Sequence, residues 1–327
     1  MVGVSIAEAA SLAKAALEAG ESGGSTPSFV DFSTELPWEG FAMDAAEGKL
    51  GIGSCKMSTE NQITLLDADT LDEIIRFPIT FPCTKLLFNK QDTSLFAASS
   101  DALRIWRHDA LAGIQRVAKL QTHSQAPPLT GFDWDERIAI SSADGQVHVF
   151  DVEKAAVISS LVVHEGSALD VAFKAERSPS TLATAGKDGC VKLLDTRDAS
   201  RATTLFKLPG PALRVQWQGS GSQQLACFGL DSSEILILDE RRPNEVLRRL
   251  DHPGSCPTAM SSTGEFLISG CSDGRLFMFS RGGDSAVPDA ALDQGAARFT
   301  GSIDGLKLLN DKTAVVVSKR VIRIFSI

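Results

Sequence analysis

The chain has 327 residues, 43% of them hydrophobic, so it is long enough to bury a large core. Its formal net charge is −9, but residues 1–50 hold eight carboxylates against two lysines, a net of −6, so the other 277 residues carry only −3. A body this close to neutral offers no broad field for phosphates, which argues against direct nucleic-acid binding. No apolar run approaches the length of a membrane span.

Residues 1–28 differ in kind from the rest and are expected to form a flexible N-terminal extension. Ser5 to Glu8 fits a capping box, an apolar stripe runs from Ile6 to Leu17, and residues 21–27 read as a linker. One interpretation is a short helix that binds a partner. The other, which we favour because short isolated helices are marginal in water, is a frayed tail.

From residue 29 onward one pattern repeats: a short apolar strand, a tight turn, and a second strand that ends just before a polar residue. In Ser180 to Asp198 the turn carries Asp188-Gly189, a pair typical of hairpins in which both turn positions have positive φ. The last apolar residue of the second strand marks each copy, at steps of 40, 44, 44, 44, 41 and 46 residues: Leu66, Trp106, Phe150, Leu194, Leu238, Phe279 and Phe325. Seven copies at this spacing predict an all-β fold, a seven-bladed WD40-type β-propeller over residues 29–327.

Each blade should contain four short strands. In the first five blades we expect them at 38–45, 50–54, 62–66 and 73–77; 84–88, 95–99, 103–107 and 114–120; 129–134, 138–142, 147–151 and 156–163; 169–174, 182–185, 191–195 and 203–207; and 212–217, 224–228, 235–239 and 246–250. Blade six takes 256–260, 266–270 and 276–280, then a surface loop at 281–296 and a fourth strand near Ala297–Thr300.

The seventh blade is one strand short before the chain stops. Its first three strands are expected at 303–309, 314–318 and 321–326, while a spare strand-like run, Phe29 to Glu35, precedes blade one. We infer that this run supplies the outer strand of blade seven and closes the ring, which would leave no long unpaired edge.

Two blades contain a histidine, a hydroxyl and an aspartate in the order of a hydrolase triad: His164, Thr184 and Asp188, and His252, Ser269 and Asp273. We favour a structural hydrogen-bond network within the blade, because an active site is needed once and this set recurs with the repeat. The chain has no P-loop, no nucleophile elbow and no cluster with metal-ligand spacing. We therefore expect no enzymatic activity, no cofactor and no metal.

Matched Asp-x-Arg pairs end the third strands of blades four and five: Asp195 with Arg197, and Asp239 with Arg241. The two arginines are 44 residues apart, one blade period, so they should lie on the same rim. With Arg242 nearby, they would form a site for carboxylates of a protein partner. The alternative, equally open from spacing alone, is that each arginine only pairs with the aspartate of its own blade.

Several longer strings give the chain a specific resemblance. It resembles the WD40 family of the plant regulator Transparent Testa Glabra and its animal homologue, a Cullin-4-associated adaptor that scaffolds dual-specificity kinases. The resemblance covers about residues 29–327 and rests on these strings: Pro37-Trp38 with Phe41-Ala42-Met43-Asp44, Pro82 to Leu86, Asp101 to Arg107, Pro128 to Trp134, His164 to Phe173, and Glu234 to Arg241.

The resemblance implies a non-enzymatic scaffold that holds protein kinases or transcription regulators. It also implies an alternative role as substrate receptor of a Cullin-4 ubiquitin ligase, because the Asp-x-Arg pairs resemble the box by which WD40 receptors dock on the Cullin-4 adaptor. Carried over, that box is Asp195, Arg197, Asp239 and Arg241; the chain departs from it in having Leu194 and Leu238 where the box has an aromatic residue, and the 281–296 insertion is unusual. The partners would be proteins, bound by a monomeric propeller.

The six cysteines, at 55, 83, 190, 227, 256 and 271, form no Cys-x-x-Cys pair, and no signal peptide precedes them. Such thiols act as small apolar residues in a reduced compartment. We therefore expect a cytoplasmic and nuclear location.

Overall fold

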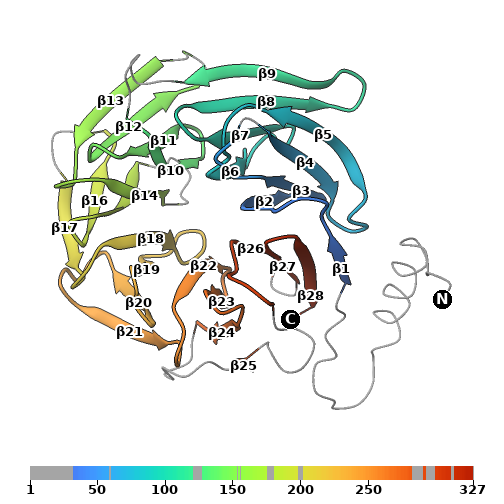
Figure 1. Cartoon of the computed structure of the whole chain (residues 1–327). Coiled ribbons are helices and arrows are strands. Elements are labelled where there is room, and N and C mark those ends of the chain that lie inside the picture. The colour runs from blue at the N-terminus through green and yellow to red at the C-terminus, as the bar shows by residue number, and fades with distance from the viewer. Residues whose placement is uncertain are drawn as a thin grey trace.

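A computed structural model describes residues 32–326 except 59, 121–126, 153, 155, 175–179, 198–201, 282–289, 292–298 and 311–312. Its strands form seven four-stranded antiparallel sheets arranged in a ring (Figure 1), which confirms the seven-bladed propeller. The N-terminal extension predicted for residues 1–28 lies outside the described residues. Within them, no helix has the length and apolar character needed to cross a membrane.

The strands follow the predicted order, four to a blade. Blades one and two contain β2 (Ala42–Ala46), β3 (Lys49–Gly53), β4 (Asn61–Asp67), β5 (Glu73–Ile79), β6 (Lys85–Phe88), β7 (Leu95–Ser99), β8 (Leu103–Asp109) and β9 (Gly113–Leu120). Blades three and four contain β10 (Leu129–Trp134), β11 (Ile138–Ser142), β12 (Gln146–Asp151), β13 (Ala156–Val162), β14 (Ala168–Phe173), β15 (Thr181–Gly186), β16 (Cys190–Asp195) and β17 (Ala202–Lys207).

Blade five contains β18 (Ala212–Trp217), β19 (Gln224–Gly229), β20 (Glu234–Asp239) and β21 (Val246–Asp251), and blade six contains β22 (Pro257–Ser262), β23 (Phe266–Cys271), β24 (Leu276–Ser280) and β25 (Ala290–Ala291). Blade seven is built from both ends of the described chain: β26 (Gly305–Asn310), β27 (Thr313–Ser318), β28 (Val321–Ser326) and β1 (Phe32–Glu35).

The predicted closure of the ring is confirmed. β1 pairs antiparallel with β28, with Phe32 opposite Ile324 and Glu35 opposite Val321. Just beyond β1, the Leu36 N–H donates to the Arg320 carbonyl at 2.7 Å, and Arg320 Nε donates back to the Leu36 carbonyl at 3.0 Å. The last three strands of the chain therefore depend on an N-terminal strand to complete their sheet.

The hydrophobic core lies between the blades. Seven clusters of buried side chains each join two neighbouring blades, so every blade packs on both of its faces. Middle strands are consequently buried almost throughout, as in β11, whereas the outermost strands, such as β13, alternate between exposed and partly buried residues. This packing explains why the middle strands read as continuous apolar runs.

The expected turn geometry at Asp-Gly is wrong. Gly189 has a φ of 78°, whereas the φ of Asp188 is not positive. The Gly189 N–H bonds to the Gly186 carbonyl at 3.0 Å, which closes a four-residue turn in which only its last residue is left-handed. The Asp188 carboxylate accepts the Cys190 N–H at 3.0 Å, a second bond that holds this turn. A Cβ at residue 189 would also lie 2.8 Å from the Leu208 carbonyl oxygen.

Blade six is the main error in strand placement. The outer strand predicted near Ala297–Thr300 is instead β25, which pairs with β24 and lies inside the expected 281–296 loop. Phe299 belongs to no strand: it is 4% exposed and packs between blades six and seven, 6.2 Å from the Phe325 ring. An apolar residue that fills an interface between blades looks, in the sequence, like one that belongs to a strand.

The same effect shortens two other predicted strands. The first strand of blade one begins at Ala42 instead of Trp38, and that of blade seven at Gly305 instead of Ile303. Trp38 and Ile303 are buried in the clusters on either side of blade seven, so their apolar character serves packing between blades.

Candidate functional site

The His-hydroxyl-Asp set of blade four comes together as a chain of hydrogen bonds. His164 Nδ1 lies 2.9 Å from Asp188 Oδ1, and His164 Nε2 lies 3.0 Å from Thr184 Oγ1. Because a carboxylate only accepts, the neutral ring carries its proton on Nδ1 and accepts the Thr184 hydroxyl on Nε2. Gly186 leaves room for the ring, since a Cβ there would lie 2.2 Å from Nδ1.

Burial decides what this chain of bonds can do. The His164 side chain and Thr184 are both 0% exposed, so no substrate can reach the hydroxyl without local opening. Burial lowers the pKa of His164, although the Asp188 carboxylate opposes that shift. Asp188 also accepts the Glu165 N–H at 3.1 Å, and so ties the loop before β14 to the turn after β15. The geometry suits a structural tether.

In blade six the corresponding set is divided. His252 Nε2 bonds to Ser269 Oγ at 2.6 Å, but Asp273 bonds to Ser255 Oγ at 2.7 Å and to Arg275 Nε at 2.6 Å. The Arg275 guanidinium and the Ser255 hydroxyl therefore take the place that the imidazole has in blade four. The structure brings together all three predicted residues in one blade and only two in the other.

The Asp-x-Arg pairs, which we call the arginine rim (Asp195, Arg197, Asp239 and Arg241), have one geometry in both blades. Arg197 donates Nε and Nη2 to the two Asp195 oxygens at 3.0 and 2.7 Å, and Arg241 donates the same atoms to Asp239 at 2.9 and 2.6 Å. The arginine side chains nevertheless remain 74% and 65% exposed. Pairing within the blade and exposure to a partner are thus compatible.

The carboxylates of the rim are firmly held. Hydrogen bonds from the Arg241 side chain lower the pKa of Asp239 to about 2, and those from Arg197 lower the pKa of Asp195. Each carboxylate also accepts the backbone N–H of its arginine at 2.9 Å. The forks are therefore fixed by both main-chain and side-chain bonds.

An ion pair and a hydrogen bond connect blade four to the turn of blade five that carries Arg241. Lys174 Nζ, at the end of β14, lies 2.7 Å from Glu240 Oε1 in the turn after β20, and 5.4 Å from the centre of the Trp217 ring. The Asn244 N–H in the same turn donates to the Leu205 carbonyl of β17 at 2.7 Å. The turn that carries Arg241 is therefore bonded directly to blade four.

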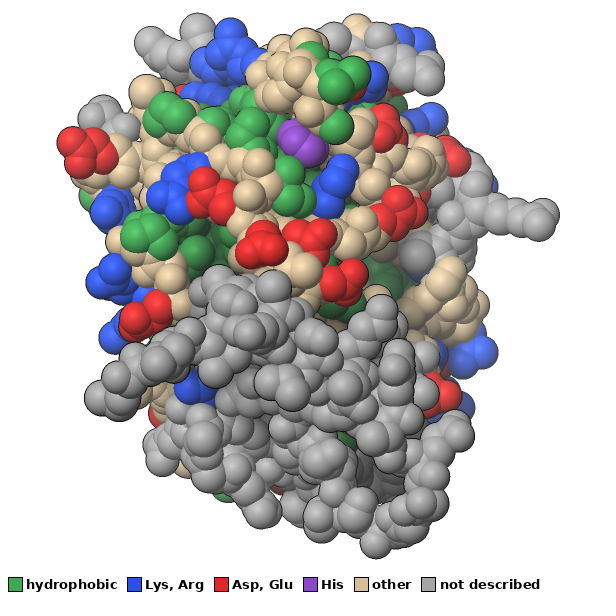
Figure 2. All heavy atoms as spheres, turned by 90° about the vertical axis from the view of Figure 1, so that its right-hand side faces the viewer, with side chains coloured by type: hydrophobic (Ala, Val, Ile, Leu, Met, Phe, Trp, Pro, Cys, Tyr) green, Lys and Arg blue, Asp and Glu red, His purple; other side chains and the backbone are tan. Residues whose placement is uncertain are grey.

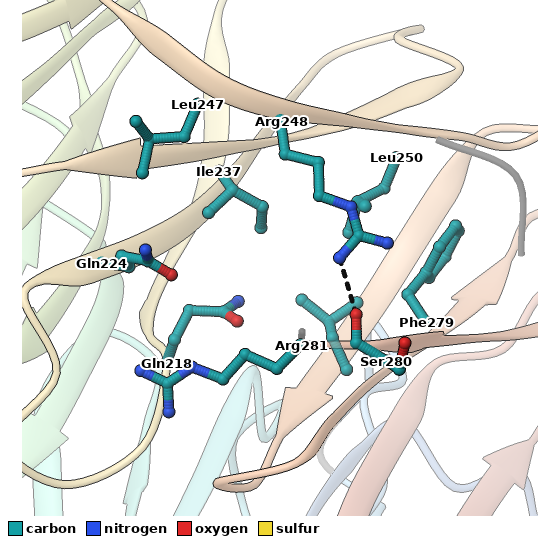
Figure 3. A pocket seen from close by; sticks show the side chains of 10 residues that line it. Gln218, Gln224, Ile237, Leu247, Arg248, Leu250, Phe279, Ser280 and Arg281 are labelled. Atoms are coloured by element: carbon teal, nitrogen blue, oxygen red, sulfur yellow. Dashed lines mark hydrogen bonds between the residues drawn. The ribbon is translucent and has the colours of Figure 1, made fainter. Parts of the chain in front are cut away.

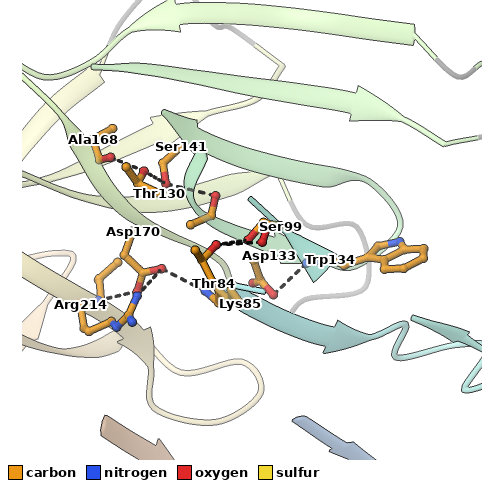
Figure 4. A network of polar contacts seen from close by, with 12 residues as sticks. Thr84, Lys85, Ser99, Thr130, Asp133, Trp134, Ser141, Ala168, Asp170 and Arg214 are labelled. Atoms are coloured by element: carbon orange, nitrogen blue, oxygen red, sulfur yellow. Dashed lines mark hydrogen bonds and ion pairs between the residues drawn. The ribbon is translucent and has the colours of Figure 1, made fainter. Parts of the chain in front are cut away.

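A central channel runs where the first strands of the blades meet. It has a volume of about 610 Å³ and is lined by the first strands of the blades. Its cations are matched by carboxylates: Lys85 lies 3.0 Å and Arg214 3.9 Å from Asp170 (Figure 4), and Lys307 lies 2.7 Å from Asp44. In the described part of the chain, no group of His, Cys, Asp or Glu has a metal-binding arrangement.

The channel carboxylates also link one blade to the next, a role that the sequence analysis missed. Asp44 accepts the N–H of Phe88 at 2.9 Å, Asp133 that of Phe173 at 2.8 Å, and Asp170 that of Val215 at 3.2 Å. Each acceptor lies on the first strand of one blade, and its donor lies on the first strand of the next blade. A lone carboxylate within an apolar first strand was the available signal.

The surface shows mixed charge. On the side that carries blades one and two, outside the grey atoms, acidic and basic side chains are interspersed with hydrophobic ones (Figure 2). This agrees with the near-neutral charge of residues 51–327.

No family model matches the chain. It is similar to WD repeat proteins: it is 27% identical over 216 residues to a DDB1- and CUL4-associated factor 7 homolog of Dictyostelium discoideum, covering 60% of this chain and 65% of that protein. It is 28% identical over 263 residues to an uncharacterized WD repeat-containing protein of Schizosaccharomyces pombe (65% and 60%) and 24% over 265 residues to one of Saccharomyces cerevisiae (66% and 50%). The chain thus spans less than two thirds of these relatives. The likeness supports the WD repeat part of the resemblance; the link to Transparent Testa Glabra stays a prediction.

Proposed function

We propose that the chain is a non-enzymatic WD40 scaffold that assembles protein complexes, with the arginine rim as a docking surface for carboxylates of a partner. The observation that carries this proposal is the pairing of two exposed guanidiniums, on equivalent turns of neighbouring blades, each held in place by its own aspartate. Loop faces and rims are the surfaces a closed propeller has to offer, since its strand edges are used in the ring.

The physical advantage lies in preorganisation. A guanidinium has five N–H donors, and a bidentate pair with aspartate uses only Nε and one Nη, so the fork can take a second carboxylate. Arg197 and Arg241 lose little side-chain entropy on binding because both are already held. Since both are exposed, they also lose less solvation than buried charges would.

The kind of partner follows from the resemblance and the relatives. We propose a protein kinase, transcription regulators, or both, in the cytoplasm and nucleus. The alternative is a substrate receptor of a Cullin-4 ubiquitin ligase. It is supported by the likeness to the Dictyostelium relative, a DDB1- and CUL4-associated factor 7 homolog, and by the two Asp-x-Arg pairs. In either case the ligand is a protein.

The test is affinity capture followed by mass spectrometry, with Arg197→Glu combined with Arg241→Glu. A matched control, Arg107→Glu with Arg116→Glu, makes the same charge change on two exposed arginines of blade two. The rim variant should lose at least one partner that the wild type and the control both retain, while its circular dichroism spectrum shows that it stays folded. An identical set of partners for all three proteins would exclude the rim as a docking surface.

The two candidate roles need a second measurement. Purified chain and purified Cullin-4 adaptor are mixed and analysed by size-exclusion chromatography. Co-elution that the rim variant abolishes supports the receptor role. Separate elution, with the kinase or regulator still captured from cells, supports the scaffold alone.

A further inference from the structure

A second recess lies between blades five and six. It has a volume of about 170 Å³, roughly ten times the 15 Å³ that one water needs, so it can admit a side chain. One wall is apolar, with Ile237 and Leu250 from blade five and Phe279 from blade six. Polar side chains line the rest of the pocket, among them the hydrogen-bond donors Gln218, Arg248 and Arg281. We call this recess the blade 5–6 pocket.

Gln218 is the feature that points to a ligand. Its side chain is only 4% exposed, and its Nε2 has no hydrogen-bond partner among the described residues. Figure 3 shows the Gln218 amide and the Arg248 guanidinium turned toward the middle of the pocket. A buried amide N–H without an acceptor is unfavourable, so an acceptor supplied from outside would be favoured there.

Arg281 sets the charge of that acceptor. It donates to Ser222 Oγ at 2.8 Å and to the Gly264 carbonyl at 3.3 Å, both neutral oxygens. Within the described ranges, no carboxylate forms an ion pair with Arg281. Other arginines of the same blades are paired with carboxylates, as Arg241 is with Asp239 and Arg275 with Asp273. Arg248 donates Nη1 to the Ser280 carbonyl at 2.6 Å, which holds its guanidinium at the pocket (Figure 3).

The pocket adjoins the arginine rim. Gln224, in its wall, is the strand partner of Asp239, so β19 and β20 connect the two sites directly. Leu247 and Arg248 are the second and third residues of β21, the strand that follows the turn carrying Arg241. A peptide that places one acidic residue on the rim could therefore place another in the pocket.

We propose that the blade 5–6 pocket binds the carboxylate of a glutamate or aspartate side chain of a protein partner, with Gln218 Nε2 and the two guanidiniums as donors. The apolar wall would contact the methylene groups of that side chain. The proposal rests on the proposed function only in that the ligand belongs to a protein.

The probe is a capped tripeptide, Ala-Glu-Ala, with capped Ala-Gln-Ala as its uncharged match, titrated into the full chain and followed by the side-chain amide resonance of Gln218. One carboxylate should bind at about millimolar affinity, since charge-assisted bonds are offset by the cost of association. The glutamate peptide should shift the resonance saturably, and the glutamine peptide should not.

Variants separate the donors from mere folding effects. Arg281→Met should weaken binding about tenfold. The control Arg249→Met changes an exposed arginine of β21 that pairs with Glu234, and should leave binding unchanged. Gln218→Met, followed by the peptide's own resonances, should also weaken binding. Melting temperatures within a few degrees of the wild type confirm folding.

Three results would overturn the pocket: no saturable shift, equal shifts with both peptides, or full binding by the Arg281 variant. The double rim variant separates this outcome from that of the proposed function. It should still bind the peptide, and loss of binding there would assign the peptide to the rim instead. If the rim variant keeps all its partners while the pocket assay succeeds, the rim is excluded as a docking surface and the pocket proposal is supported.

Discussion

Removal of β1 should destabilise the whole ring. Deleting residues 1–36 removes the four-residue ladder to β28, on the order of 2–4 kcal/mol at about 1 kcal/mol per net hydrogen bond. It also removes Leu36, which is 5% exposed in the cluster between blades seven and one, and whose truncation alone costs about 2–5 kcal/mol. The total, roughly 4–9 kcal/mol, is comparable with the entire stability of a domain, about 5–15 kcal/mol.

Urea unfolding followed by tryptophan fluorescence measures this loss. Four proteins are compared: the full chain, the chain without residues 1–28, the chain without residues 1–36, and Leu36→Ala. Removal of residues 1–28 leaves β1 in place, so the midpoint should stay close to that of the full chain. Removal of residues 1–36 should lower the midpoint by more than about 1 M, taking an m-value of about 3 kcal/mol/M. Leu36→Ala should lie between them.

Equal midpoints for the two truncated chains would refute the reasoning. Such a result would mean that β28 needs no outer partner and that the ring closes through packing alone. A shorter chain that aggregates at once fits the expectation, because an uncovered β28 presents an unpaired edge.

Three further predictions concern single residues. Burial lowers the pKa of His164, so the unfolded chain, with an ordinary value of 6.5, binds the proton more readily; stability should fall as the pH drops below about 6.5, and His164→Asn should flatten the urea midpoint between pH 7 and 5. The pKa of Asp239 falls from 3.8 to about 2, so its contribution is complete above pH 3.8 and is lost toward pH 2. Asp239→Asn should cost about 1 kcal/mol at pH 7, less than the full shift implies because its arginine partner is exposed, and the difference from wild type should vanish in acid. Gly270→Ala should cost about 1–3 kcal/mol in the same assay, since its Cβ would lie 2.4 Å from Ile303, whereas Gly264→Ala, which meets nothing within 4 Å, should not.

The candidate sites differ in how far the sequence could foresee them. The arginine rim was visible because Asp195-x-Arg197 recurs one period later, and a side chain that pairs with a residue two positions away needs only local structure. The blade 5–6 pocket was not visible, because Gln218 and Arg281 are 63 positions apart and meet only when two blades pack. The division of the blade six set has the same cause. Asp273 bonds to Ser255 and Arg275 instead of His252, and the sequence alone does not show which of these side chains lies closest to it.

By itself the sequence determined the number of blades, their order and the strand that closes the ring, because a period near 44 residues and alternating short runs reflect backbone geometry that each repeat adopts locally. Only the tertiary structure decided which apolar residues extend a strand and which fill the space between blades, as Phe299 and Trp38 do. Apolar side chains are buried both within a strand and between two blades, so the sequence does not distinguish the two positions. Which position a residue occupies is decided only when neighbouring blades pack together.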